Sequence, residues 1–201
     1  MSTRTITQPR PGRPSPLERW ALPLVVTATL AALIAAVLLT RGGDSAGGGG
    51  AAPPGAVAPD FSALDVVSGR TITLGDLEGR KTLLFFSEGA ACQACLVQIA
   101  DLERDRGLRE RDVDLVSVST DSPDVLSAAA RQYGITTPML SDASREMSSD
   151  YGMLGRGGMG HPDTDGHAFM LLDRSGRIVW EREYGEMYVR PAELLAELSR
   201  G

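Results

Sequence analysis

The sequence predicts an α/β protein, with a mixed β-sheet flanked by helices and one transmembrane helix before it. Between residues 60 and 201, short apolar runs typical of buried strands alternate with segments whose apolar residues recur at helical spacing. Nearer the N-terminus, an apolar run without charge is followed by a glycine-rich stretch. The chain has 201 residues, enough for one globular domain besides these two segments.

The run over residues 20–40 reads WALPLVVTATLAALIAAVLLT and contains no charged residue. A helix of this length matches a hydrocarbon core of roughly 30 Å. The run therefore predicts a transmembrane helix over 20–41, following a basic tail over 1–19. Four arginines precede the run, and only Arg41 follows it closely. This asymmetry predicts a single-pass protein of the cell membrane, with its N-terminus in the cytoplasm and the rest outside.

Residues 42–59 read GGDSAGGGGAAPPGAVAP and predict a flexible linker, because a glycine-rich chain loses much backbone entropy when it orders. Its reach is about 20–25 Å. A cleaved secretory signal fits this end of the chain less well, since its apolar region usually spans about 7–15 residues.

The domain over 60–201 is acidic, with fifteen lysines and arginines against twenty-four aspartates and glutamates, a net charge of −9. Such a surface repels phosphate backbones, so we expect no nucleic-acid partner.

The first half of the domain contains strands and one helix. APDFSALDVVSGRTITLGDL, from residue 58 onward, alternates apolar and polar residues around Ser68-Gly69, which predicts two short strands joined by a turn. KTLLFFS (81–87) and VDLVSVST (113–120) are typical of buried strands. Between them, apolar residues recur at helical intervals from Cys92 onward.

The second half continues this alternation. Ser122, Pro123 and Gly134 mark the N-cap, first turn and end of a helix. SREMSSDYGM (144–153) predicts a shorter helix, and HAFMLLDRSGRIVWER (167–182) a hairpin with its turn at DRSG. RPAELLAELSR (190–200) predicts a closing amphipathic helix.

Cys92 and Cys95 are the only cysteines of the chain and lie where the strand over 81–87 meets the following helix. The pair could be a structural disulfide, part of a metal site or a redox pair. A disulfide over so short a loop stabilises the fold little. Backbone N–H groups at a helix start stabilise a thiolate, which predicts a Cys92 pKa below the free value of about 8.5. The sequence therefore favours a redox pair in which Cys92 attacks and Cys95 resolves.

The segment APDFSALDVVSGRTITLGDLEGRKTLLFFSEGAACQAC resembles the opening of membrane-tethered thioredoxin-like proteins of the redoxin, or AhpC/TSA, superfamily. YGITTPMLSD and FMLLDRSGRIV continue the resemblance, which covers about 60–190. It implies a thioredoxin-like fold, a nucleophile at Cys92 and a resolving thiol at Cys95.

Three positions depart from the peroxiredoxins of this superfamily. Where those proteins have a proline and a threonine before the cysteine, this chain has Phe85 and Gly89, and His167 stands where they have an arginine. The groups that would polarise a peroxide are absent. The sequence therefore favours an extracytoplasmic thiol-disulfide oxidoreductase, with a peroxiredoxin-type thiol peroxidase as one alternative.

The other alternative is a copper or zinc chaperone of the Sco type. His161 and His167 are the only histidines, and both lie near the predicted hairpin. His167 could be the general base for the thiols, or it could join Cys92 and Cys95 as a metal ligand. The predicted site is Cys92, Cys95 and His167.

Two motifs near the histidines have simpler explanations. GRGGMG (155–160) matches a dinucleotide-binding pattern, but HPDTDG after it cannot begin a helix, which predicts a loop beside the active site. Met147, Met153 and Met159 are interpreted as packing residues. Disulfide exchange needs no cofactor, and we expect none. The expected partners are exported proteins with thiols or disulfides and a membrane protein that donates electrons.

Overall fold

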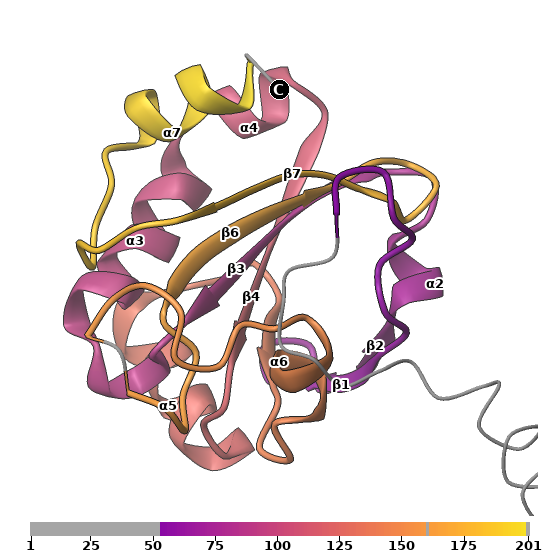
Figure 1. Ribbon diagram of the computed structural model, residues 1–201. Coiled ribbons are helices and arrows are strands. Elements are labelled where there is room, and N and C mark those ends of the chain that lie inside the picture. The colour runs from indigo at the N-terminus through magenta and orange to yellow at the C-terminus, as the bar shows by residue number, and fades with distance from the viewer. Residues whose placement is uncertain (1–52, 160, 200–201) are drawn as a thin grey trace, which may run out of the picture. The chain divides into compact units, whose positions relative to one another are not determined.

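A computed structural model describes residues 53–159 and 161–199 of the protein. These residues form one seven-stranded mixed sheet with the strand order β2-β1-β5-β4-β3-β6-β7 (Figure 1). The strands are β1 (Ser62–Asp65), β2 (Thr71–Thr73), β3 (Lys81–Ser87), β4 (Val113–Ser119), β5 (Met139–Ser141), β6 (His167–Leu172) and β7 (Ile178–Glu183). The helices are α2 (Leu74–Leu77), α3 (Gln93–Arg104), α4 (Gly107–Glu110), α5 (Pro123–Tyr133), α6 (Glu146–Asp150) and α7 (Pro191–Leu198).

These elements confirm the mixed sheet flanked by helices. β3 pairs in parallel with β4, and β4 with β5, whereas the other neighbouring strands are antiparallel. Both predicted hairpins form. In the second, the Asp173 carboxylate accepts the N–H groups of Ser175 and Arg177 and thereby fixes the turn. β3 and β4, the longest strands, lie among the central strands of the sheet. Helices cover both faces there, which is why residues pointing to either face are mostly apolar.

The sequence did not reveal β5, α2 or α4. β5 has three residues, too few to show a periodicity, yet it joins the first hairpin to the rest of the sheet. The buried Asp65 strengthens this junction, because its carboxylate accepts the N–H groups of Val67 in the turn and of Met139 in β5.

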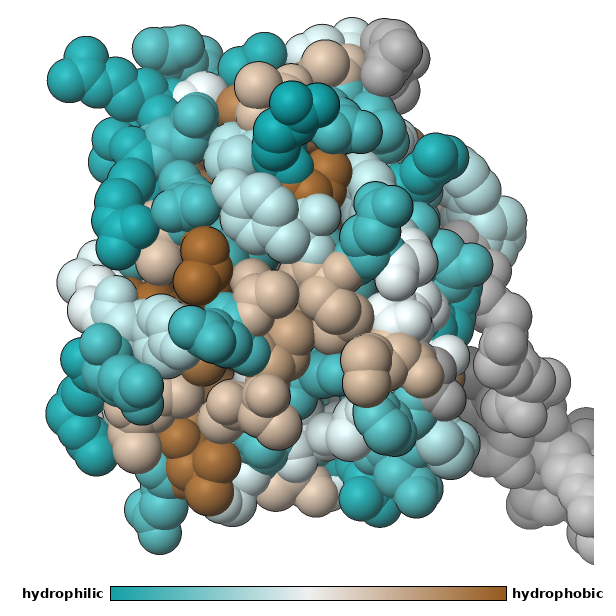
Figure 2. All heavy atoms as spheres, turned by 90° about the vertical axis from the view of Figure 1, so that its left-hand side faces the viewer, coloured by the Kyte–Doolittle hydropathy of each residue, from teal (hydrophilic) through white to brown (hydrophobic). Residues whose placement is uncertain are grey.

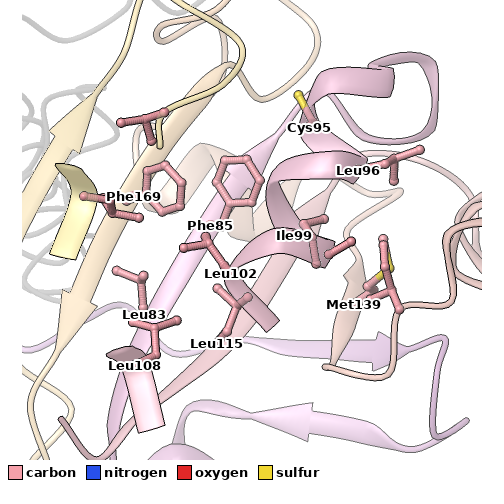
Figure 3. Packing of buried hydrophobic residues seen from close by; sticks show 14 of the residues in the cluster. Leu83, Phe85, Cys95, Leu96, Ile99, Leu102, Leu108, Leu115, Met139 and Phe169 are labelled. Atoms are coloured by element: carbon pink, nitrogen blue, oxygen red, sulfur yellow. The ribbon is translucent and has the colours of Figure 1, made fainter. Parts of the chain in front are cut away.

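The core has two parts, one on each face of the sheet. Alternate residues of β3 point to opposite faces, so Leu83 and Phe85 pack with α3, α5 and α7, and Leu84 and Phe86 pack with α6. Figure 3 shows the first part, in which Phe85 and Phe169 lie side by side and Cys95 lies at the start of α3, at one end of the cluster. The cysteine pair thus sits at the edge of a packed core.

The folded domain begins earlier than residue 60. Gly55 and Ala58 donate their N–H groups to Ile178 and Gly176, and Ala58 is buried. The predicted linker over 42–59 is therefore too long by these residues, which find backbone partners in the second hairpin.

The predicted basic tail, transmembrane helix and most of the linker lie outside the described residues. Within the described ranges, no helix has both the length and the apolar character needed to cross a membrane.

Candidate active site

Cys92 lies between the end of β3 and the start of α3. After β3 the chain makes a short 3₁₀ turn, η2 (Gly89–Ala91), and Cys92 donates its N–H to Gly89. Cys92 has extended backbone geometry and is the N-cap of α3. The predicted strand-to-helix junction is thus confirmed, with the first sulfur at the positive end of a twelve-residue helix.

Cys92 and Cys95 are joined in a disulfide, and their Cα atoms lie 5.3 Å apart. The N–H of Cys95 also points at the Cys92 sulfur, at a distance of 3.1 Å. Cys92 is 9% exposed and Cys95 is fully buried. The cysteines are therefore not equivalent, because only Cys92 offers any surface to a substrate.

Asp121, two residues beyond the end of β4, holds the turn before Cys92. Its carboxylate accepts the N–H of Ala90 at 2.6 Å and the hydroxyl of Ser119 at 3.1 Å. Its backbone is held in turn, because the Asp121 N–H donates to Ser119 and the Asp121 carbonyl accepts the Ser141 hydroxyl. Asp121 follows β4, so β4 and β5 together support the cysteine turn.

Gly89 makes this contact possible. Its φ of +74° is a backbone geometry that glycine adopts at little cost. A Cβ at this position would meet the Asp121 carboxylate and the Ser119 hydroxyl directly. The glycine that stands where a peroxiredoxin threonine is expected therefore suits the turn, because another residue would be strained at this φ and would displace the side chains of Asp121 and Ser119.

His167 is the first residue of β6 and pairs with Ser87, the last residue of β3, just before the cysteine turn. Its imidazole is fully buried and packs edge-on against Phe85, Phe169 and Tyr184. Neither ring nitrogen has a hydrogen-bond partner among the described residues. The fold thus brings His167 to the cysteine end of the sheet without a hydrogen bond to either sulfur.

Burial lowers the pKa of His167 to about 4, because no carboxylate compensates the cost of desolvating the imidazolium. At neutral pH the ring is therefore uncharged. A base with so low a pKa removes a thiol proton poorly, so the geometry favours the helix start over His167 as the group that activates Cys92.

A loop over residues 154–159 covers His167. Arg156 pairs with Glu181 at 2.6 Å and Glu183 at 3.0 Å on β7, and its carbonyl accepts the His167 N–H. Gly157 lies so close to His167 and Tyr184 that a Cβ would press on their backbones. The predicted loop is confirmed, and charged pairs fasten it.

The Glu88 carboxylate, next to the cysteine turn, accepts the Met159 N–H from this loop at 2.9 Å.

Three methionines were expected to be packing residues. Met147 and Met153 do pack in the core, but the prediction for Met159 was wrong, because this residue is 70% exposed. His161 is also exposed.

Histidine, cysteine and acidic side chains in the described part of the chain do not gather in any group of three that could hold a metal ion.

The side of the molecule that carries α3 and α7 shows apolar side chains in its middle, with hydrophilic ones around them (Figure 2).

Comparisons with known proteins cover the part of the chain that contains this site. A model of the AhpC/TSA family matches residues 54–180, which include the cysteine turn, the first predicted hairpin and most of the second. Peroxiredoxin Bcp of Escherichia coli (strain K12) is 30% identical over 127 residues, 62% of this chain and 81% of that protein.

Solved structures give the same fold. Peroxidoxin BcpB from Mycobacterium tuberculosis superposes with a TM-score of 0.62 at 22% identity, over 73% of this chain and 96% of that one. AhpC from Enterococcus faecalis also has a TM-score of 0.62, at 22% identity, over 73% of this chain and 90% of its own. These similarities confirm the thioredoxin-like arrangement.

Proposed function

Because this chain belongs to the AhpC/TSA family, we propose that it is a thiol peroxidase of the peroxiredoxin type, in which Cys92 attacks the peroxide and Cys95 resolves the product. One observation carries the proposal. Cys92, which is 9% exposed, caps the start of α3 and is bonded to a fully buried Cys95. The family and the peroxiredoxin relatives support an oxidoreductase of this class.

In the first step, the Cys92 thiolate attacks one peroxide oxygen. The O–O bond breaks, the departing oxygen leaves as water or an alcohol after taking a proton, and Cys92 becomes a sulfenic acid. The Cys95 thiol then attacks the Cys92 sulfur, an S–S bond forms and the hydroxyl leaves as water. An external dithiol protein must return two electrons and two protons to complete the cycle.

The environment of Cys92 bears on the rate of the first step. Gly89 and His167 occupy the positions of the expected threonine and arginine, so no hydroxyl or guanidinium from these positions faces Cys92. The partial positive charge near its sulfur comes from the start of α3, including the Cys95 N–H. A peptide dipole is weaker than a guanidinium, so we expect a slower reaction than an arginine-assisted site would give. The comparisons nevertheless support the peroxidase over the disulfide exchange that the sequence favoured.

A peroxidase assay tests this proposal. The reduced full-length protein is mixed with hydrogen peroxide or cumene hydroperoxide, and the loss of thiols is followed together with the loss of peroxide. We expect two thiols consumed per peroxide in the unmodified protein. Cys92→Ser should be inactive, and Cys95→Ser should consume one thiol per peroxide and stop at a sulfenic acid that dimedone traps. Peroxide loss that does not depend on Cys92 would contradict the proposal.

One observation favours a second function, thiol-disulfide exchange with proteins. The disulfide is accommodated with α3 intact from Gln93, so neither thiol needs local unfolding to reach the other. Such a pair can also accept or donate a protein disulfide. Insulin reduction in the presence of dithiothreitol tests it, with Cys92→Ser as the inactive control.

We also propose that the protein is anchored in the cell membrane by residues 20–41, with the redox domain outside the cytoplasm. The uncharged run and the arginines before it support this location. An electron-donating membrane protein and exported thiol proteins are the partners expected there. Protease protection of residues 60–201 in intact spheroplasts would contradict this orientation.

A further inference from the structure

The contact between Asp121 and the cysteine turn has a consequence beyond the proposed reaction. The turn that carries Cys92 has little apolar anchoring, because Gly89, Ala90 and Ala91 have small side chains or none. The Ala90 N–H instead ends on the Asp121 carboxylate at 2.6 Å, thirty-one residues later in the chain. A hydrogen bond to a charged acceptor is among the stronger ones in proteins.

Asp121 is itself held in place. Ser119 donates its hydroxyl to the Asp121 carboxylate and accepts the Asp121 N–H, and Ser141 donates to the Asp121 carbonyl. Ser119 and Ser141 are the last residues of β4 and β5. The carboxylate is thus fixed to the centre of the sheet, and Gly89 leaves the space in which it meets the turn.

We propose that Asp121 is a positioning residue, which orders the Cys92 turn so that the Cys92–Cys95 disulfide closes at a low entropic cost. The inference rests on the proposed redox role of the two cysteines. A turn ordered before the bond forms loses less conformational freedom when it closes.

The redox step that reports this role is exchange with glutathione. The reduced dithiol reacts with glutathione disulfide, the Cys92–Cys95 bond forms, and two molecules of reduced glutathione leave with the two electrons and two protons. The equilibrium constant of this exchange measures how readily the pair closes. It does not depend on peroxide, so a failure of the peroxidase assay and a failure of this inference are distinguishable.

The experiment compares full-length variants at pH 7. Asp121→Ala removes the acceptor, and we expect its equilibrium constant to fall about tenfold, because the reduced turn then has more conformational freedom to lose when the disulfide closes. Asp121→Asn keeps an oxygen that can accept the Ala90 N–H, so its value should stay within about threefold of the unmodified protein, given a similar bond to a neutral acceptor. Asp124→Ala, an exposed aspartate in the first turn of α5, is the matched control and should be unchanged.

Circular dichroism establishes that each variant is folded. If Asp121→Ala does not fold, Ser119→Ala replaces it, because it loosens the carboxylate without removing it, and its constant should fall about threefold on the same reasoning. A folded Asp121→Ala with the unmodified constant would overturn the inference. An equilibrium constant for Asp121→Asn as low as that of Asp121→Ala would also overturn it. Where Ser119→Ala is the variant used, an unchanged equilibrium constant would do the same. So would an unmodified protein that forms no Cys92–Cys95 disulfide.

Discussion

Desolvation shifts the pKa values of two buried side chains in one segment, Asp165 and His167, in opposite directions. Burial lowers the pKa of His167 to about 4, while burial and, to a lesser extent, the Asp142 carboxylate raise the pKa of Asp165 to about 8. Both groups are therefore uncharged in the folded protein near neutral pH. Each shift predicts a dependence of the free energy of unfolding on pH.

For His167, the unfolded chain binds a proton below about pH 6.5, whereas the folded protein does so only near pH 4. The stability contributed by the neutral ring is present above pH 6.5 and is lost as the pH falls toward 4, by up to about 3 kcal/mol. His167→Phe, which suits the surrounding aromatic rings, should abolish this loss in urea unfolding at pH 7 and 4.5. His161→Phe, at an exposed position, is the control and should keep it. An identical pH slope in His167→Phe and the unmodified protein would contradict this account.

For Asp165, the folded protein keeps its proton up to about pH 8, whereas the unfolded chain loses it near pH 4. Stability should therefore fall as the pH rises between these values, by a few kcal/mol. Asp165→Asn should remove the slope, so that its stability relative to the unmodified protein grows from pH 5 to pH 8. A constant difference between the two proteins across this range would show that Asp165 does not titrate as described.

At the level of residues, the sequence identified the cysteines but not their supports. Two cysteines in a CxxC pattern carry a local signal, and His167 was predicted because it is one of only two histidines in the sequence and lies in the hairpin expected near the cysteines. Asp121 had no such signal. It lies thirty-one residues from the turn that it holds, and only the pairing of β3 with β4 brings them together. The φ of Gly89 was equally hidden, because it depends on that contact.

At the level of elements, the ion pairs of Arg156 are one anchor of the loop over 154–159. The pair between Arg156 and Glu181 is mostly buried, with 29% and 14% of the side chains exposed. We expect Arg156→Ala to destabilise the protein by roughly 1–2 kcal/mol and to speed limited proteolysis within the loop. Arg174→Ala is the control, since its pair with Asp112 is exposed, and it should change neither quantity. Equal proteolysis of Arg156→Ala and the unmodified protein would show that the Arg156 ion pairs do not hold the loop.

The longer elements were predictable from sequence because each contains a complete local pattern. α5 has a proline in its first turn and ends at Gly134, whose φ of +65° is suited to a left-handed C-cap. The four-residue helices α2 and α4 and the three-residue strand β5 carry too few residues for periodicity to show. Their positions depend on the elements that they pack against.

At the scale of the whole molecule, the prediction of a sheet with helices on both faces was correct, but the order of its strands was not accessible. β5 was missing from the sequence prediction, so nothing placed the first hairpin at one edge of the sheet. The function illustrates the same limit. The missing threonine and arginine argued against a peroxidase, whereas the family match over 54–180 supports one. Single positions in a site can change while the fold and the reactive cysteine remain.

The most direct test of the central claim is the rate at which hydrogen peroxide oxidises Cys92 in the reduced full-length protein. Stopped-flow measurements on the unmodified protein, Cys92→Ser and Cys95→Ser separate the two steps of the proposed cycle. We predict a second-order reaction that needs Cys92, and a later, peroxide-independent closure that needs Cys95. Oxidation no faster than that of free cysteine, or unchanged in Cys92→Ser, would contradict the account.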